Sequence, residues 1–114
     1  MAVIFKIMGE RDFAASQKGG FVTPAAVDRA DGFIHLSAED QVLETARLHF
    51  AGRDDLVAVS FETAALGSAL QWEASRGGAL FPHYYGALSM AHAAQALRLV
   101  RRIDGSFAFG AAVS

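Results

Sequence analysis

Apolar and polar positions alternate over several short runs of the chain, a period of two that is typical of strands. Residues 3–7 and 56–61 show it most clearly, because both are rich in Val, Ile or Phe. Asp104-Gly105 is a strong signal for a tight hairpin turn. The pattern therefore predicts a strand-rich chain with mostly antiparallel neighbours. The remaining predicted strands are 33–36, 70–74, 80–85, 97–103 and 106–109.

Two segments have the period of an amphipathic helix. The shorter covers residues 10–18 and is ended by Gly19-Gly20. The longer is predicted to start at Ser37, whose hydroxyl can cap the first turn, and to end at Gly52. Its apolar stripe consists of Val42, Leu43, Ala46 and Phe50. Less regular stretches are predicted as a loop with at most one helical turn at 21–32 and as a brief helix at 90–96.

These elements predict an α+β fold: small mixed, mostly antiparallel sheets with one long helix and a second, shorter N-terminal helix. Pro82 lies within one predicted strand. Because proline cannot donate a backbone hydrogen bond, we expect that strand at a sheet edge or at a bulge.

Composition then limits the class of protein. The chain has 114 residues, 53% of them hydrophobic and 19% charged, which predicts a single folded domain over residues 1–114. It has no cysteine, which excludes disulfides, thiolate metal sites and a nucleophilic thiol. No apolar run approaches the length of a membrane span, and the N-terminus lacks a signal-peptide pattern. We therefore expect a cytoplasmic protein without a membrane partner.

The charge argues against a nucleic-acid partner. The formal net charge is −2, and binding to phosphate backbones usually relies on several clustered cations. The one basic cluster consists of Arg98, Arg101 and Arg102. On a strand these side chains would point to both faces, so a solvated edge is expected.

His35 is the first candidate for chemistry. If its neighbours Ile34 and Leu36 face the core, His35 points to the opposite face of the sheet, where it can line a cleft beside Ser37. A neutral imidazole donates one hydrogen bond and accepts another, which suits a ribose hydroxyl or a phosphate. The alternative is a half-buried histidine bonded to a backbone carbonyl.

The run Phe81-Pro82-His83-Tyr84-Tyr85 is the second candidate. Its aromatic side chains can stack on a planar ring while His83 binds a phosphate or a ribose, with Tyr84 or Tyr85 beneath the ring. The alternative is an aromatic edge strand that completes the core.

Glu73 and Arg76 add charge near these motifs. Glu73 can bind ribose hydroxyls, act as a base or fix a histidine tautomer, or it is simply solvated. Arg76 is expected to pair with Glu73, with a phosphate as the alternative partner. Trp72, which alternates with Glu73, is expected in the core.

Other site types find no support in the sequence. His49 and His92 lack the close paired spacing of zinc motifs, so no metal site is expected. Gly19-Gly20 and Gly77-Gly78 are turns and do not form a phosphate loop, and there is no nucleophile elbow.

Together these motifs resemble a bacterial family named domain of unknown function 952, over nearly the whole chain. The motifs that carry the resemblance are GFIHLS at 32–37, Trp72-Glu73 and LFPHYYG at 80–86. The family resembles the ADP-ribosyltransferase fold, whose members bind NAD between two small strand layers. By this resemblance His35 occupies the first motif position, and no residue clearly matches the usual catalytic Glu.

We therefore predict a cleft that binds a nucleotide-like ligand of the NAD or ADP-ribose type, with NAD as a substrate if the protein is an ADP-ribosyltransferase-like enzyme. The catalytic candidates are His35, His83 and Glu73, and the binding candidates are Ser37, Tyr84, Tyr85 and Arg76. Two alternatives remain: a non-catalytic module that binds a ligand or a protein, and a dimerising domain that pairs through the edge at 97–109. The sequence does not predict the oligomeric state.

Overall fold

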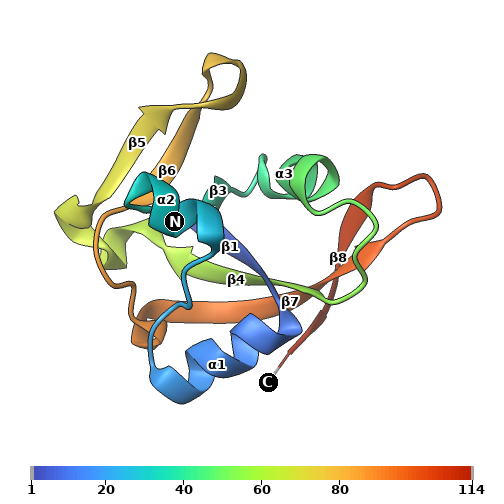
Figure 1. Ribbon diagram of the computed structural model, residues 1–114, viewed down its shortest axis with the longest axis horizontal. Helices are drawn as coiled ribbons and strands as arrows, with labels where there is room; N and C mark the ends of the chain where they lie inside the picture. The colour runs from blue at the N-terminus through green and yellow to red at the C-terminus, as the bar shows by residue number, and fades with distance from the viewer. Residues whose placement is uncertain (1, 114) are drawn as a thin grey trace.

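The computed structural model describes residues 2–113, which form an α+β fold with three α-helices and two antiparallel sheets (Figure 1). The strands and helices are β1 (Val3–Gly9), α1 (Glu10–Gly19), α2 (Ala26–Asp31), β2 (Ile34–His35), β3 (Ser37–Ala38), α3 (Val42–His49), β4 (Leu56–Glu62), β5 (Leu70–Ala74), β6 (Leu80–Tyr84), β7 (Ala93–Arg101) and β8 (Phe107–Ala112). Short 3-10 turns are η1 (Thr63–Ala65), η2 (Gly67–Ala69), η3 (Arg76–Gly78) and η4 (Met90–His92).

The two sheets differ in size and position. The large sheet has the strand order β3-β1-β4-β7-β8, and the small sheet has the order β2-β6-β5. The hairpin of β5 and β6 projects away from the large sheet in Figure 1. β3 pairs only with Ile4 and Phe5, so the rest of β1 has no strand partner on that side within residues 2–113. This open edge of β1 lies beside the candidate site.

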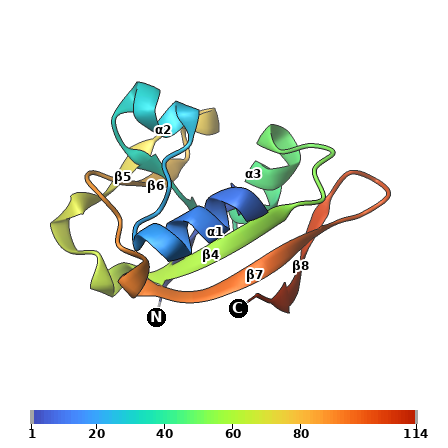
Figure 2. The same cartoon turned by 60° about the horizontal axis from the view of Figure 1, so that its bottom comes forward.

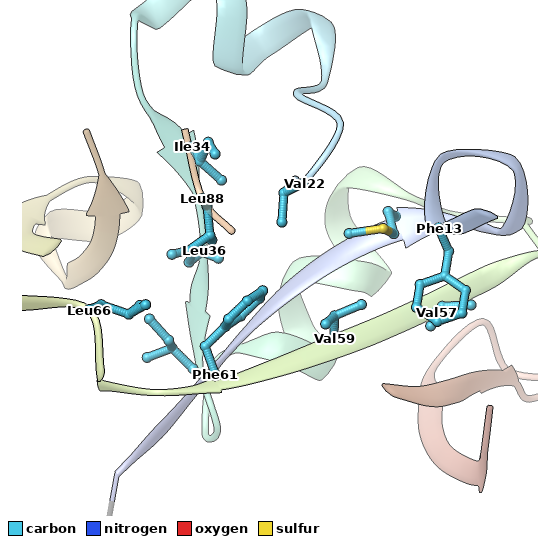
Figure 3. Packing of buried hydrophobic residues seen from close by; sticks show 11 residues of the cluster. Phe13, Val22, Ile34, Leu36, Val57, Val59, Phe61, Leu66 and Leu88 are labelled. Carbon is cyan, nitrogen blue, oxygen red and sulfur yellow. The ribbon is translucent and has the colours of Figure 1, made fainter. Parts of the chain in front are cut away.

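Each face of the large sheet carries its own hydrophobic core, because successive side chains of β1 and β4 point to opposite faces. One core joins β1 and β4 to α1 and to the small sheet, and Figure 3 shows Leu36 and Phe61 within it. α1 lies against β4 and contributes Phe13 to this core (Figure 2). The other core packs Val42 and Ala46 of α3 against the opposite face. The small sheet and α3 are thus held on opposite sides of β1.

The predicted long helix is wrong in its start and its length. Ser37 does not cap it, because Ser37–Ala38 pairs with β1 as strand β3, and α3 begins only at Val42. Gln41 secures the turn in between: its side chain accepts from the Ala38 N–H and donates to the Leu80 carbonyl. At eight residues α3 is shorter than α1, which has ten. The apolar stripe is confirmed, since Val42 and Ala46 are fully buried.

The edge position predicted for the Pro82 strand is also wrong, because β6 is the central strand of the small sheet. Pro82 sits where the ladder with β2 ends: its carbonyl accepts from the Leu36 N–H at 3.1 Å. The return bond cannot form, since proline has no N–H. A central strand tolerates this proline because β2 needs no further pairing at that point.

Two other predictions need correction. Residues 21–32 contain the six-residue helix α2. The brief helix predicted at 90–96 is limited to η4, after which β7 continues as a strand to Arg101. The remaining strands and the hairpin at Asp104-Gly105 are confirmed. Within residues 2–113, no helix is long and apolar enough to cross a membrane.

Candidate functional site

The pleat of the small sheet gathers the predicted chemistry on one face. His35 of β2 is the cross-strand partner of His83 of β6, and Glu73 of β5 lies opposite Phe81, two residues from His83. Because side chains two residues apart share a face, these groups all point to the same side as Tyr85. We call this the histidine face, defined by His35, Glu73, Phe81, His83 and Tyr85.

A cavity of about 470 Å³ adjoins the histidine face. It lies between the small sheet, α3, η3 and the open edge of β1, and most of its lining is apolar. Its polar side chains come from segments far apart in the sequence: Lys6, His35, Ser37, Thr45, His49, Ser75, Arg76 and His83. The cavity therefore has the usual composition of a small-molecule site, a largely apolar wall with a few convergent polar groups.

His83 is oriented by Glu73. His83 is 5% exposed, and its Nδ1 lies 2.7 Å from Oε1 of Glu73. The same Oε1 accepts a hydrogen bond from the Tyr85 hydroxyl at 2.7 Å. Hydrogen bonds from His83, which has the larger effect, and from Tyr85 lower the pKa of Glu73. The hydrogen bond between Tyr85 and Glu73 raises the pKa of Tyr85. A neutral ring that donates from Nδ1 keeps a lone pair on Nε2.

His83 lines the cavity, and its second ring nitrogen, Nε2, is not engaged by Glu73. No partner for it is found among residues 2–113, and no buried side-chain nitrogen in that part of the chain is left unpaired, so Nε2 reaches an accessible surface. Phe33 stacks on the ring with centroids 4.1 Å apart and holds its plane. His83 is thus a fixed acceptor or base at the cavity wall.

His35 is held by Asp28, a buried residue of α2. Nδ1 of His35 lies 2.7 Å from Oδ1 of Asp28, and the same carboxylate accepts hydrogen bonds from the backbone N–H groups of His35 and Ala25. Its other strong partner is the buried Lys6, whose Nζ lies 2.8 Å from Oδ2. Asp28 therefore joins β1, α2 and β2 through a single carboxylate.

The electrostatics of this network favour its charged form. Burial alone would raise the pKa of Asp28, but the charge of Lys6 and the converging N–H donors lower it overall. Burial lowers the pKa of Lys6, and Asp28 partly offsets this effect. Asp28 is thus an ionised carboxylate with fixed donors on both oxygens.

Arg76 of η3 also lines the cavity. Its guanidinium lies 4.8 Å above the ring of Phe81, and its Nη1 donates a long bond of 3.4 Å to the hydroxyl of Thr45. Thr45 also accepts from Ser37 at 3.2 Å. The predicted ion pair between Arg76 and Glu73 is wrong, because Glu73 is engaged by His83 and Tyr85. The ion-paired arginines within residues 2–113 are Arg47, Arg53, Arg98 and Arg101.

The structure separates the three aromatic candidates. Tyr84 points away from the histidine face and packs against the core, so its predicted place in the cleft is corrected. Tyr85 is 43% exposed and does not line the cavity, and its ring lies 5.3 Å from that of Phe33 between centroids. Trp72 is 43% exposed, so the prediction that it lies in the core is wrong. Its side of the projecting hairpin of β5 and β6 extends beyond the core.

Sequence reasoning missed Asp28, Lys6 and Thr45. One signal was available: Lys6 interrupts an apolar strand, and a lysine at such a position needs a buried partner. The sequence did not identify that partner, since Asp28 lies 22 residues away in a segment predicted as a loop. Within residues 2–113, no three His, Asp or Glu side chains converge as a metal site.

Comparison with known proteins identifies the family. The family model described as Protein of unknown function (DUF952) matches residues 7–96. A crystal structure of protein CC0527 from Caulobacter crescentus is 42% identical, with a TM-score of 0.88 over 93% of each chain. The solution NMR structure of CC0527 is 43% identical, with a TM-score of 0.81 over 91% of this chain and 90% of that one. No curated protein matches significantly. The chain therefore belongs to the DUF952 family of proteins of unknown function.

Proposed function

We propose that the cavity binds a nucleotide-like ligand of the NAD or ADP-ribose type. The observation that carries the proposal is Arg76: its guanidinium lies at the cavity, 4.8 Å from the centroid of the Phe81 ring, and forms no ion pair with a carboxylate among residues 2–113. A planar guanidinium in this setting is suited to a phosphate, which it binds through two parallel hydrogen bonds.

The rest of the cavity fits the other parts of such a ligand. The hydroxyl of Thr45 accepts hydrogen bonds from Ser37 and from Arg76, so its own O–H can donate to the phosphate that Arg76 binds. Nε2 of His83 can accept from a ribose hydroxyl. The apolar wall, which includes Ile7 and Phe50, suits a planar base, and a volume of about 470 Å³ lies within the range of small-molecule sites. The resemblance to the ADP-ribosyltransferase fold, which rests on the sequence motifs alone, points to the same class of ligand.

We expect ADP-ribose and AMP to raise the melting temperature of the protein, and adenosine to raise it much less at equal concentration. A ligand that binds only the folded state at 100 times its Kd stabilises it by about 2.7 kcal/mol. Thermal denaturation measures these shifts in melting temperature, and titration calorimetry measures the affinities. If no phosphate-bearing nucleotide shifts the transition at millimolar concentration, or if adenosine acts as strongly as AMP, the proposal is wrong.

The pairing of Glu73 with His83 favours a second candidate, catalysis on a bound NAD. In this reaction a water or acceptor oxygen attacks C1′ of the ribose, the bond to nicotinamide breaks, and nicotinamide leaves with the bonding electron pair. Nε2 of His83 takes the proton from the attacking oxygen. Glu73 does not line the cavity and acts through His83 as a positioning residue.

We expect purified protein to release nicotinamide from NAD, and His83→Gln to reduce the rate by about 100-fold or more, the usual contribution of a general base. Chromatographic detection of nicotinamide checks this. His92→Gln is the matched control, since His92 is exposed and outside the cavity. Binding of ADP-ribose without any nicotinamide release contradicts catalysis and assigns a non-catalytic binding role.

A further inference from the structure

His35 differs from His83 because both of its ring nitrogens face carboxylates. Nδ1 lies 2.7 Å from Oδ1 of Asp28, and Nε2 lies 2.9 Å from Oδ2 of Asp31. Both contacts are hydrogen bonds when the ring carries both protons. The other charged or titratable groups near the ring are Lys6, which bonds to the His35 carbonyl, and His83, at 5.5 Å between centroids.

The two carboxylates are held very differently. Asp28 is 3% exposed and its carboxylate is held in place by Lys6 and two backbone N–H groups. The side chain of Asp31 is 47% exposed, and within residues 2–113 its contact with His35 is its only side-chain hydrogen bond. Nε2 is therefore the nitrogen whose partner can be exchanged.

We propose that Asp31 occupies, on Nε2 of His35, the position that an anionic oxygen of the ligand takes on binding. This inference rests on the proposed function, because it concerns a ligand in the same cavity, which His35 lines. A carboxylate oxygen and a phosphate oxygen present the same acceptor to an imidazole N–H. His35 is then a second anion-binding point besides Arg76, and the site selects ligands that bring an anionic oxygen to each.

The consequence is that Asp31 competes with the ligand and determines specificity. Removing its charge frees Nε2 and removes a like charge from the approach of the phosphate. An exposed ion pair of this kind corresponds to a change in Kd of about two- to fivefold. Adenosine has no anionic group, so its affinity is expected to be unchanged.

The test is calorimetric titration of ADP-ribose and adenosine into the wild type, Asp31→Asn and Asp31→Ala. Both variants should bind ADP-ribose about two- to fivefold more tightly. Asp54→Asn is the matched control, an exposed aspartate paired with Arg101 away from the cavity, and should bind like the wild type. A second readout is the ¹⁵N shift of His35 Nε2, which ADP-ribose should move in the wild type and adenosine should not.

The outcomes separate this inference from the proposed function. If ADP-ribose binds and Arg76→Gln weakens it, but the Asp31 variants bind equally or more weakly, the role of Asp31 is wrong and the proposed function stands. If ADP-ribose does not bind the wild type or either Asp31 variant, both are wrong. An unchanged Nε2 signal in saturated protein also overturns the role of Asp31.

Discussion

Replacing Asp28 by alanine is expected to lower the free energy of unfolding by about 3–5 kcal/mol, the usual cost of removing one partner from a buried ion pair. The variant leaves the ammonium of Lys6 buried, with the His35 carbonyl as its one remaining hydrogen-bond partner within residues 2–113. It also leaves the backbone N–H groups of Ala25 and His35 without their acceptor. Equilibrium unfolding in urea measures the loss.

Two comparisons isolate the buried charge. Asp54→Ala removes an exposed carboxylate that pairs with Arg101, and little change is expected because solvent screens such pairs. The double variant Lys6→Met/Asp28→Asn removes both charges, so its loss should be smaller than the sum of the two single losses. A strictly additive result, or an Asp28→Ala loss no larger than that of Asp54→Ala, contradicts the network.

The same carboxylate gives the sign of a pH effect. The pKa of Asp28 in the folded state lies below its ordinary value of 3.8. Its contribution to stability is therefore fully present above that value and is lost as the pH falls through the folded-state pKa. The stability difference between the wild type and Asp28→Asn should shrink on acidification below about pH 4.

Replacing Arg76 by glutamine is expected to weaken ADP-ribose binding by about 10- to 100-fold, because a hydrogen bond to a charged group contributes about 1.5–3 kcal/mol. Arg76→Lys keeps the charge but loses the planar fork and its stacking on Phe81, so an intermediate affinity is expected. Adenosine, which lacks a phosphate, should bind all three proteins alike. Titration calorimetry of the three proteins measures these differences.

Arg11→Gln is the matched control for this series. Arg11 is exposed on α1 and does not line the cavity, so its loss removes the same charge without touching the site. If Arg11→Gln weakens ADP-ribose binding as much as Arg76→Gln does, the effect comes from net charge and Arg76 is not the phosphate ligand.

Much of the fold could be predicted because its signals are local. The period of two in β1 and β4 and the Asp104-Gly105 turn each depend on neighbouring residues, and all three are confirmed. The alternation around His35 likewise places Ile34 and Leu36 in the core and His35 on the opposite face. The same alternation along β6 places His83 and Tyr84 on opposite faces of the small sheet.

The errors arise where tertiary contacts override local preference. Ser37 is a good helix cap, but the unpaired edge of β1 offers its backbone a strand partner instead. Trp72 is apolar enough for a core, but the core ends before the tip of the hairpin that carries it. The partner of Lys6 could not be predicted, since only the folded chain brings Asp28 to it. The same is true of Thr45 and Arg76, which lie 31 residues apart.

The most direct test of the central claim, that the cavity beside the histidine face binds a nucleotide-like ligand, is a map of backbone amide shifts on titration with ADP-ribose. We predict that the largest changes fall at Ser37, Thr45, Arg76 and His83, the segments that enclose the cavity. Changes that are absent at saturating ligand contradict the claim. So do changes centred on the second hollow, between α1 and the start of β7 near Met90 and Gln95.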